Sequence, residues 1–357
     1  MATEAEFLGT TVQEWTQNIR NGYMRAYILF ALHETGVFNA LKEGESKTVE
    51  ELAAECKVHP YLLNSVILYL LVCDKILERD GEKIRLTEFG RHALFADTLT
   101  TFVWGAVGGY SITLTELIPA LRGQVKYGVD FERNGEYLAI GSLLTGRGSH
   151  GWVLDYITKI GTKRLCDMGC GSAVVLTEFL KANPHLKGVG LDVSDGFLTE
   201  ARRRIADMGL QDRAVLIKGD IAKPETYIEK LGEVDCFNAM MVIHEFLAEG
   251  DQKVVDILQR MKAAFPGKMM IISEGIPYSE EEFHQLPWEN RPHPASSQYT
   301  FHGLTWQGIP QKPEVWFKIF EKAGVALEDF QGGHTFKPGD QKMTQYASRM
   351  GHYVLRF

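Results

Sequence analysis

A histidine and a glutamate stand side by side where a strand is predicted to end. The run 235–242 is largely apolar, and His244 and Glu245 follow it closely. The carboxyl ends of strands form the edge at which open α/β sheets bind ligands. Because a histidine titrates near neutrality, His244 could remove the proton of a substrate hydroxyl while Glu245 orients the ring. We therefore predict that both residues are catalytic.

A glycine-containing turn offers a place for a cofactor. The segment 165–172 reads as a strand that runs directly into a helix, and Gly169 and Gly171 lie between the two. Glycines allow a tight turn that brings backbone N–H groups close to a ligand. The third residue after Gly171 is Val174, so the segment lacks the full dinucleotide pattern G-x-G-x-x-G.

Two carboxylates are predicted at the same sheet edge. The next predicted strand ends in Asp192, about 20 residues downstream, where a carboxylate would accept hydrogen bonds from a ribose diol. The third predicted strand ends at Asp220, where an adenine amino group could donate to the side chain.

The elements that must position these residues alternate along the chain. Apolar runs predict strands at 164–168, 188–193, 214–219, 234–241 and 269–274, and amphipathic patterns predict helices at 173–182, 196–208 and 252–264. This alternation indicates parallel strands with crossover helices on both faces. The predicted fold class is α/β, with a Rossmann-like, doubly wound sheet over 155–357.

The first hundred residues have a different character. Helical periodicity dominates 12–94, a Thr48 cap precedes acidic residues, and 76–87 alternates apolar and polar positions around an Asp-Gly turn, which predicts a hairpin. Helices followed by such a wing indicate a winged-helix module over 1–100. DNA binding is one role for such a module, but the acidic balance and the apolar helices favour dimerisation.

The segment 101–154 is predicted to join the two domains and line the substrate pocket. It is rich in aromatic residues and glycines and carries few charges. Arg133 is our candidate for binding a substrate carboxylate, because a guanidinium matches that group bidentately.

Composition limits the partners. The chain has 357 residues with 38 Lys and Arg against 46 Asp and Glu, a net charge of −8, so nucleic acid is not an expected partner. The five cysteines are an odd number without zinc-site spacing and read as reduced thiols. We see neither a signal peptide nor an apolar run of the roughly 20 residues that span a membrane. We expect a cytoplasmic protein.

The cofactor motifs resemble those of a known family. Asp167-x-Gly169-x-Gly171, Asp192 and Asp220 are similar to the first three motifs of class I S-adenosylmethionine-dependent methyltransferases. The resemblance implies that Gly169 and Gly171 let the backbone run close to the methionine part of the cofactor. It also implies that Asp192 binds the ribose hydroxyls and that Asp220 and Ile221 lie on either side of the adenine. Segments 48–53 and 86–90 look like the dimerisation module of small-molecule O-methyltransferases, which implies a homodimer.

The resemblance leaves the reaction open. In its O-methyltransferases a His-Asp pair follows the fourth strand; here it is His244 with Glu245, which could serve a phenolic substrate. In the branch that methylates the β-carbon of 2-oxo acids, a histidine, a carboxylate and a later histidine hold an iron, which implies His244, Glu245 and His302, with His293 in reserve. The branch favoured here is carbon methylation with iron or another transition metal. A member that catalyses a rearrangement or cyclisation without methyl transfer, and a winged-helix regulator, are the alternatives.

Overall fold

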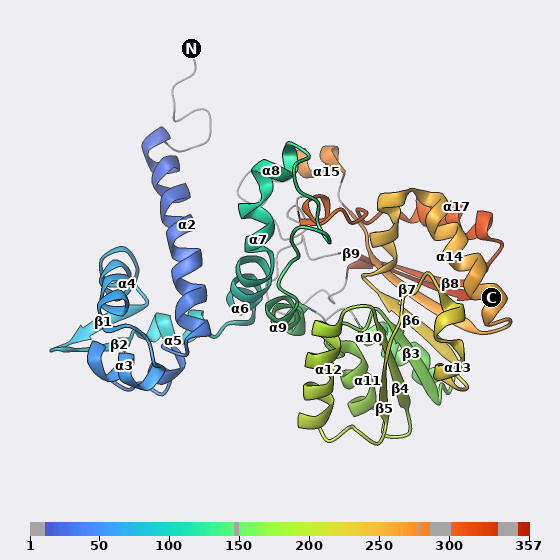
Figure 1. The fold of residues 1–357 in the computed structure, drawn as a ribbon, viewed down its shortest axis with the longest axis horizontal. Helices are drawn as coiled ribbons and strands as arrows, with labels where there is room; N and C mark the ends of the chain where they lie inside the picture. Colours follow the sequence, from blue (N-terminus) through green and yellow to red (C-terminus); the bar gives the residue numbers. More distant parts are fainter. Residues whose placement is uncertain (1–10, 146–149, 278, 286–300, 335–348) are drawn as a thin grey trace, which may run out of the picture. The chain divides into compact units, whose positions relative to one another are not determined.

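The computed structural model describes residues 11–145, 150–277, 279–285, 301–334 and 349–357. Its internal contacts divide the chain into two compact units, Met1–Gly109 and Tyr110–Phe357 (Figure 1). The division falls inside the segment 101–154. Every residue of the predicted cofactor and catalytic sites lies in the second unit, apart from the reserve ligand His293, which lies outside the described residues.

The first unit consists of helices and one hairpin. Its elements are α2 (Val12–Glu34), η1 (Asn39–Leu41), α3 (Val49–Cys56), α4 (Pro60–Cys73), β1 (Leu77–Asp80), β2 (Lys83–Leu86), α5 (Glu88–Leu94), α6 (Asp97–Thr101) and η2 (Phe102–Gly109). The predicted hairpin is confirmed, with Leu77 opposite Leu86. Thr48 caps α3 through a reciprocal capping box with Glu51, which satisfies two otherwise unpaired N–H groups.

The second unit contains a seven-stranded sheet of order β5-β4-β3-β6-β7-β9-β8. Helices α7 (Tyr110–Thr115), α8 (Leu117–Leu121), α9 (Gly135–Thr145) and α10 (Gly151–Lys159) precede it. The predicted strands are β3 (Arg164–Met168), β4 (Lys187–Asp192), β5 (Ala214–Lys218), β6 (Cys236–Met240) and β7 (Met269–Gly275), all parallel. The predicted crossover helices are α11 (Val174–Ala182), α12 (Asp195–Asp207) and α14 (Asp251–Ala264). The doubly wound fold is confirmed.

Two further strands were not predicted. Strands β8 (Ala326–His334) and β9 (Arg349–Arg356) follow α17 (Pro313–Ala323), and β9 pairs antiparallel with both β7 and β8. Charged and glycine residues interrupt both segments, and a register shift falls between Leu327 and Asp329, so neither shows a clean two-residue period. The remaining short elements are η4 (Pro224–Thr226), α13 (Ile228–Leu231), η5 (Ile243–Glu249) and α15 (Glu280–Gln285).

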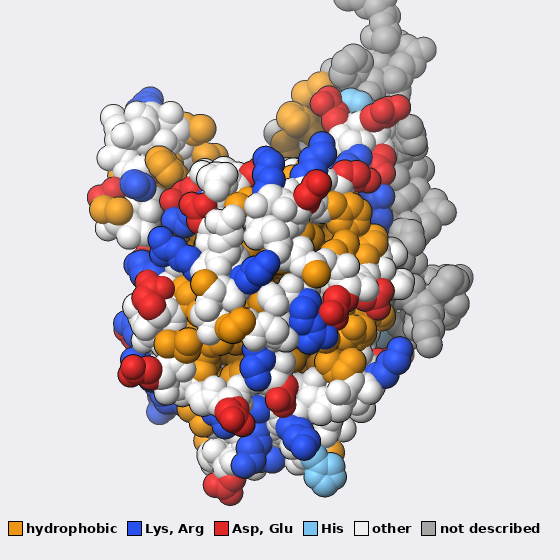
Figure 2. All heavy atoms as spheres, turned by 90° about the vertical axis from the view of Figure 1, so that its right-hand side faces the viewer, with side chains coloured by type: hydrophobic (Ala, Val, Ile, Leu, Met, Phe, Trp, Pro, Cys, Tyr) orange, Lys and Arg blue, Asp and Glu red, His pale blue; other side chains and the backbone are white. Residues whose placement is uncertain are grey.

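The surface and the thiols agree with the composition. On the face drawn in Figure 2, basic and acidic side chains are interspersed among apolar groups. All five cysteines are free thiols, and three of them are buried. In the described part of the chain, no helix combines the length and the apolar character that crossing a membrane requires.

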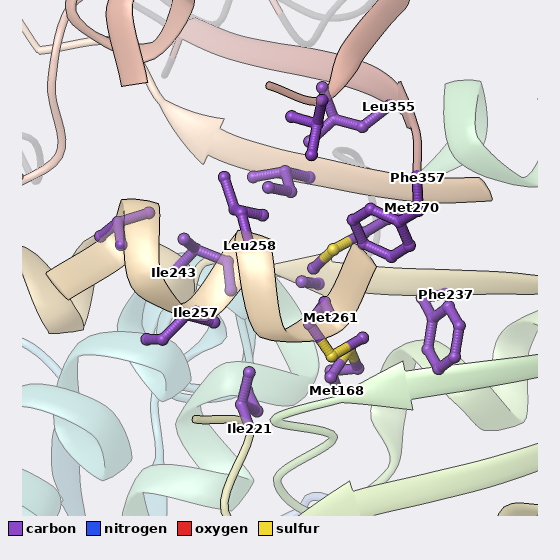
Figure 3. Packing of buried hydrophobic residues seen from close by; sticks show 14 of the residues in the cluster. Met168, Ile221, Phe237, Ile243, Ile257, Leu258, Met261, Met270, Leu355 and Phe357 are labelled. Atoms are coloured by element: carbon purple, nitrogen blue, oxygen red, sulfur yellow. The ribbon is translucent and has the colours of Figure 1, made fainter. Parts of the chain in front are cut away.

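The sheet has a hydrophobic core on each face. One core packs α13, α14 and α17 against side chains such as Met168, Phe237 and Met270 (Figure 3). The other packs α10, α11 and α12 against Leu165, Cys236 and Ile271. Because successive residues of a strand point to opposite faces, neighbours in one strand contribute to different cores. Glu274 shares the parity of Met270, so it lies on the face that α14 covers.

Candidate functional site

The glycine turn after β3 adopts the conformation that a cofactor cradle needs. Gly169 and Gly171 have φ angles of 68° and 53°, in the left-handed region that favours glycine. The N–H groups of Gly169 and Cys170 donate to the carbonyl of Leu191, at 2.7 and 3.0 Å. A Cβ on Gly169 would lie 2.6 Å from a methyl carbon of Val242, so only glycine fits there.

Asp192 ends β4 beside this turn. One carboxylate oxygen accepts a hydrogen bond from the N–H of Gly171 and the other from the N–H of Ser194, each at 2.9 Å. Burial raises the pKa of Asp192 above its ordinary value, while these backbone hydrogen bonds oppose the rise. Each oxygen keeps further lone-pair capacity, so a ribose diol can still bind.

The other predicted cofactor residues have partners within the protein. Asp167 is buried, and its Oδ1 accepts a hydrogen bond of 2.7 Å from the side chain of Asn238; burial raises its pKa to about 7. Asp220 accepts from the N–H of Ala222 at 2.9 Å, and Ile221 packs into the core. The turn follows β3, Asp192 ends β4 and Asp220 lies two residues beyond the end of β5, so all three stand at the carboxyl edge of adjacent parallel strands, where such a cradle can hold S-adenosylmethionine.

His244 forms a buried pair with Glu274. Its Nδ1–H donates to one oxygen of Glu274 at 2.5 Å, and its backbone N–H donates to the other at 3.1 Å. Burial lowers the pKa of His244, but the charge and hydrogen bond of Glu274 outweigh burial and raise the pKa above its usual value. The Nε2 atom is buried without a hydrogen-bond partner among the described residues. Neutral His244 therefore presents Nε2 as a proton acceptor.

The end of β6 turns sharply to place this histidine. Met241 has a φ of 55°, an uncommon value for a residue with a side chain, and its N–H donates to the carbonyl of Ser273 at 2.8 Å. Ile243, which begins η5, is fully buried in the core. The strained turn and the buried Ile243 together hold His244 over the edge of the sheet.

His302 reaches the same place from a distant segment. It lies in a helical turn at 301–304, and its ring stacks on that of His244 with centroids 4.8 Å apart and planes 28° apart. Gly308 docks this segment, since its N–H donates to the carbonyl of Glu245 at 3.0 Å. A Cβ on Gly308 would lie 2.0 Å from the backbone oxygen of His244. Burial, with the charges of His244 and Arg133, lowers the pKa of His302 to about 3.

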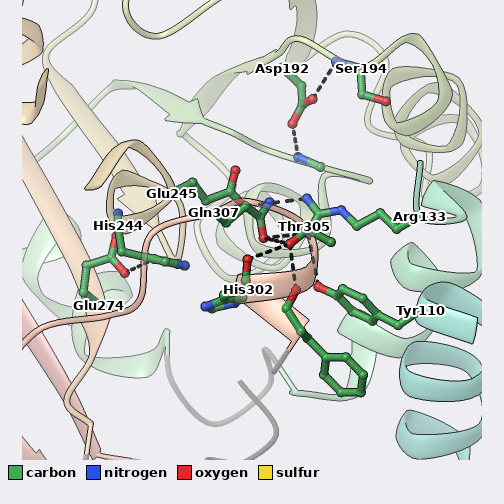
Figure 4. A network of polar contacts seen from close by, with 12 residues as sticks. Tyr110, Arg133, Asp192, Ser194, His244, Glu245, Glu274, His302, Thr305 and Gln307 are labelled. Atoms are coloured by element: carbon green, nitrogen blue, oxygen red, sulfur yellow. Dashed lines mark hydrogen bonds and ion pairs between the residues drawn. The ribbon is translucent and has the colours of Figure 1, made fainter. Parts of the chain in front are cut away.

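Arg133 joins the site through a polar network (Figure 4). Its guanidinium donates to the hydroxyl of Tyr110 at 3.1 Å and to the side-chain oxygen of Gln307 at 3.3 Å, and lies 3.6 Å from the carboxylate of Glu245. Burial lowers the pKa of Arg133, but the charges of Tyr110, Glu245 and Tyr127 outweigh burial and raise it. Burial is also the main reason that the pKa of Glu245 is raised.

The structure thus brings together four residues that the sequence singled out: His244, Glu245, His302 and Arg133. The expected role of Glu245 in orienting the His244 ring is wrong, because Glu274 contacts that ring and Glu245 pairs with Arg133. Glu274 was missed as a functional residue. A carboxylate at the end of the fifth predicted strand, on the same sheet edge as His244, was the signal that could have found it.

The predicted metal site is not confirmed. Within the described ranges, no group of three or more His, Cys, Asp and Glu side chains is arranged to hold a metal ion. The lone pairs of an imidazole lie in its ring plane, so the stacked rings of His244 and His302 direct theirs along separate lines. As placed, His244, Glu245 and His302 do not fit a metal ion.

Part of this chain matches a known protein family, and two curated proteins align with most of its length. Residues 165–264 match the family described as "Methyltransferase domain". Methyltransferase ungE' of Aspergillus campestris is 24% identical over 270 residues, 71% of this chain and 72% of that protein. The 3-O-methylredipecamine 2-O-methyltransferase IpeOMT3 of Carapichea ipecacuanha is 23% identical over 348 residues, 83% of this chain and 87% of that protein.

A solved structure shares the whole fold. Human N-acetylserotonin methyltransferase in complex with SAM aligns with a TM-score of 0.65 and 19% identity, over 97% of this chain and 98% of that one. The helical first unit and the sheet of the second unit therefore recur together in a known architecture.

Proposed function

We propose that this chain, a small-molecule methyltransferase that depends on S-adenosylmethionine, methylates the β-carbon of a small 2-oxo acid. The observation that carries this proposal is the presence of a buried base and a partly buried guanidinium in one polar site. His244 supplies the base, with Nε2 unpaired within the described residues, and Arg133 supplies the guanidinium.

Arg133 suits the carboxylate of such a substrate. Its contacts with Tyr110 and Gln307 are long hydrogen bonds, and its 3.6 Å approach to Glu245 is an ion pair beyond hydrogen-bonding distance. A guanidinium has five N–H donors, so donors remain for a carboxylate. Arg133 would then bind the carboxylate of the substrate, and His244 would lie beside C3.

The chemistry begins with a proton transfer. His244 Nε2 takes a proton from C3, the C–H electron pair forms the C2=C3 double bond, and the carbonyl electron pair moves to the keto oxygen. S-adenosylmethionine, held by the turn at Gly169 and Gly171 and by Asp192, would supply a methyl group from its sulfonium to C3, with the C–S electron pair staying on sulfur and the carbonyl re-forming. The imidazolium of His244, paired with Glu274, then returns the proton to solvent.

Transfer to a hydroxyl oxygen is the rival reaction. IpeOMT3 is named for such a transfer, and the same His244–Glu274 pair could deprotonate a phenol. Arg133 would then have no carboxylate to bind. The two reactions differ in the atom that receives the methyl group.

The test uses a donor labelled with ¹³C in its methyl group. Purified protein is offered 4-methyl-2-oxopentanoate, phenylpyruvate and a panel of phenols, and NMR identifies the labelled product. A new C–CH₃ group on a 2-oxo acid supports the proposal, whereas labelled O–CH₃ products alone refute it. His244→Gln should abolish transfer while leaving binding of the donor unchanged.

A second pair of variants tests the carboxylate contact. Arg133→Met should raise KM for the acid at least tenfold and leave KM for its methyl ester nearly unchanged. Arg122→Met, at an exposed arginine, is the matched control. Equal effects of Arg133→Met on acid and ester would exclude carboxylate binding by Arg133.

We also propose that the protein forms a homodimer through its first unit. An apolar stripe of Val12, Trp15, Ile19, Tyr23 and Tyr27 is exposed along α2, at helical spacing. Exposed contiguous apolar surface of this kind is typical of protein interfaces. Light scattering should give twice the chain mass for the wild type and the single mass for Ile19→Asp; a monomeric wild type would exclude the dimer.

A further inference from the structure

We propose that the imidazole of His302 donates a hydrogen bond to the keto oxygen of the bound 2-oxo acid and so stabilises the enolate that His244 generates. This inference rests on the proposed function and adds a second catalytic residue to it. The role of His302 as a metal ligand, expected from the resemblance, is replaced by a direct contact with substrate.

The first observation is a second unpaired nitrogen. His302 Nδ1 is buried, and among the described residues it has no hydrogen-bond partner, as is also true of His244 Nε2. The two residues are 9% and 1% exposed. Leaving a buried polar atom unpaired is unfavourable, so a ligand that pairs with both atoms gains binding free energy from doing so.

The second observation is the firm attachment of the turn that carries His302. Its carbonyl accepts hydrogen bonds from the N–H of Gln307 at 2.9 Å and the hydroxyl of Thr305 at 3.3 Å. The ring of the preceding Phe301 stacks on Tyr110 with centroids 4.4 Å apart. The backbone of this turn is therefore satisfied and held, while Nδ1 of His302 keeps its hydrogen-bonding capacity for a ligand.

The third observation is the position of the two rings. They stack with centroids 4.8 Å apart, and Figure 4 shows them side by side, with the Arg133 network beyond the His302 turn. In a 2-oxo acid, the keto oxygen is two bonds from C3 and the carboxylate adjoins the keto carbon. Three adjacent groups on the protein thus correspond to three adjacent groups on the substrate.

The hydrogen bond stabilises the enolate as it forms. As His244 removes the C3 proton, negative charge accumulates on the keto oxygen, and an N–H held close to that oxygen stabilises the charge. With its hydrogen on Nδ1, His302 supplies this donor. When C3 bonds to the methyl carbon, the charge leaves the oxygen and the hydrogen bond returns to ordinary strength. No electron or proton is left unaccounted for.

The experiment separates the hydrogen bond from the ring stacking. His302→Asn keeps an amide N–H near the place of Nδ1, and His302→Phe keeps the stacked ring without a donor. Each protein is incubated in D₂O with phenylpyruvate or 4-methyl-2-oxopentanoate and S-adenosylhomocysteine, and NMR follows exchange of the C3 hydrogens. Calorimetry measures binding of S-adenosylmethionine by each variant as a check on folding.

We expect His302→Phe to exchange about 100-fold more slowly than the wild type, since removal of one oxyanion donor costs about 10²–10³ in rate. His302→Asn should lose less than tenfold, and both should bind the donor like the wild type. Equal exchange by the wild type and His302→Phe would overturn the inference, as would a His302→Asn variant as slow as His302→Phe.

Two further outcomes are distinguishable. If a chelator abolishes exchange in the wild type and iron or another metal restores it, a metal polarises the keto oxygen and the direct role of His302 is wrong, although carbon methylation stands. If the wild type neither exchanges C3 hydrogens nor methylates any 2-oxo acid, but methylates phenols, the proposed function fails and this inference fails with it.

Discussion

Replacing Glu274 by glutamine tests whether the buried His244–Glu274 pair is the catalytic base. The substitution keeps the side-chain volume and an oxygen that can accept from the backbone N–H of His244. It removes the negative charge that lies 2.5 Å from the ring nitrogen. Glu274 itself is fully buried, so no water screens its effect on His244.

The size of the effect follows from two contributions. A hydrogen bond to a charged group contributes about 1.5–3 kcal/mol, which corresponds to roughly a 10- to 150-fold change. The imidazolium that forms during proton transfer also loses its counter-ion, and general-base catalysis as a whole contributes about 10²–10⁴-fold. We therefore expect Glu274→Gln to lower kcat by about 10²–10³-fold.

The pH profile gives an independent readout. His244 must be neutral to accept a proton, so kcat/KM rises with pH through the pKa of His244. Glu274 raises that pKa and burial lowers it. Without the carboxylate, burial prevails, and the acidic limb of the profile should move to lower pH even as the maximum falls.

The control is Glu245→Gln, which neutralises the neighbouring carboxylate that does not touch the ring. Its charge also raises the pKa of His244, but less than Glu274 does, so its limb should move by a smaller amount. A Glu274→Gln enzyme with wild-type kcat and an unmoved limb would refute the assignment. A larger limb shift in Glu245→Gln than in Glu274→Gln would do the same.

Three other predictions concern cofactor, packing and acid stability. Asp192→Ala should raise the Kd for S-adenosylmethionine about 10- to 100-fold by calorimetry; an unchanged Kd would exclude Asp192 from the site. Gly308→Ala should lower both Tm and kcat, because its Cβ would meet the His244 carbonyl at 2.0 Å, whereas Gly303→Ala, with open space around it, should match the wild type. Burial lowers the pKa of His33 and of His352 to about 4, so the unfolded chain takes up protons first as pH falls below 6.5. Each of these two histidines should therefore lower the free energy of unfolding by roughly 2 kcal/mol between pH 7 and pH 5, as measured by urea titration. In the His33→Leu variant the part of this loss that is due to His33 should be absent.

The fold was largely predictable because local patterns and topology agree. Four of the five parallel strands, β3, β4, β6 and β7, are buried along most of their length and therefore read as apolar runs, whereas β5 lies at the edge of the sheet and is only partly buried. Each of the five was predicted within two residues of its bounds. The last two strands were not found, because β8 carries Glu328 and Asp329 on the exposed edge of the sheet and β9 includes Gly351 and His352. Their place in the sheet depends on long-range pairing, of β9 with β7 and of β8 with β9, which no local pattern records.

The sequence predicted most residues of the site, but it did not predict which of them contact one another. His244, Glu245 and Asp192 were found because strand ends converge on one edge of a parallel sheet. The partner of His244 was not found, since adjacency in sequence favours Glu245 while adjacency in space selects Glu274 on β7. Neighbours along η5 point in different directions, so Glu245 turns toward Arg133 instead.

These charge pairings indicate which step of the proposed reaction most needs stabilisation by the protein. Glu245 pairs with Arg133, and Glu274 would balance the charge that His244 gains when it accepts a proton, so the imidazolium formed in the reaction is compensated inside the site. Methyl transfer from a sulfonium to an enolate cancels two opposite charges, and a water-poor site favours such a step. Forming the enolate is the step that separates charge. In the proposed reaction the imidazoles of His244 and His302, one accepting the proton and one donating a hydrogen bond to the keto oxygen, both act on that step.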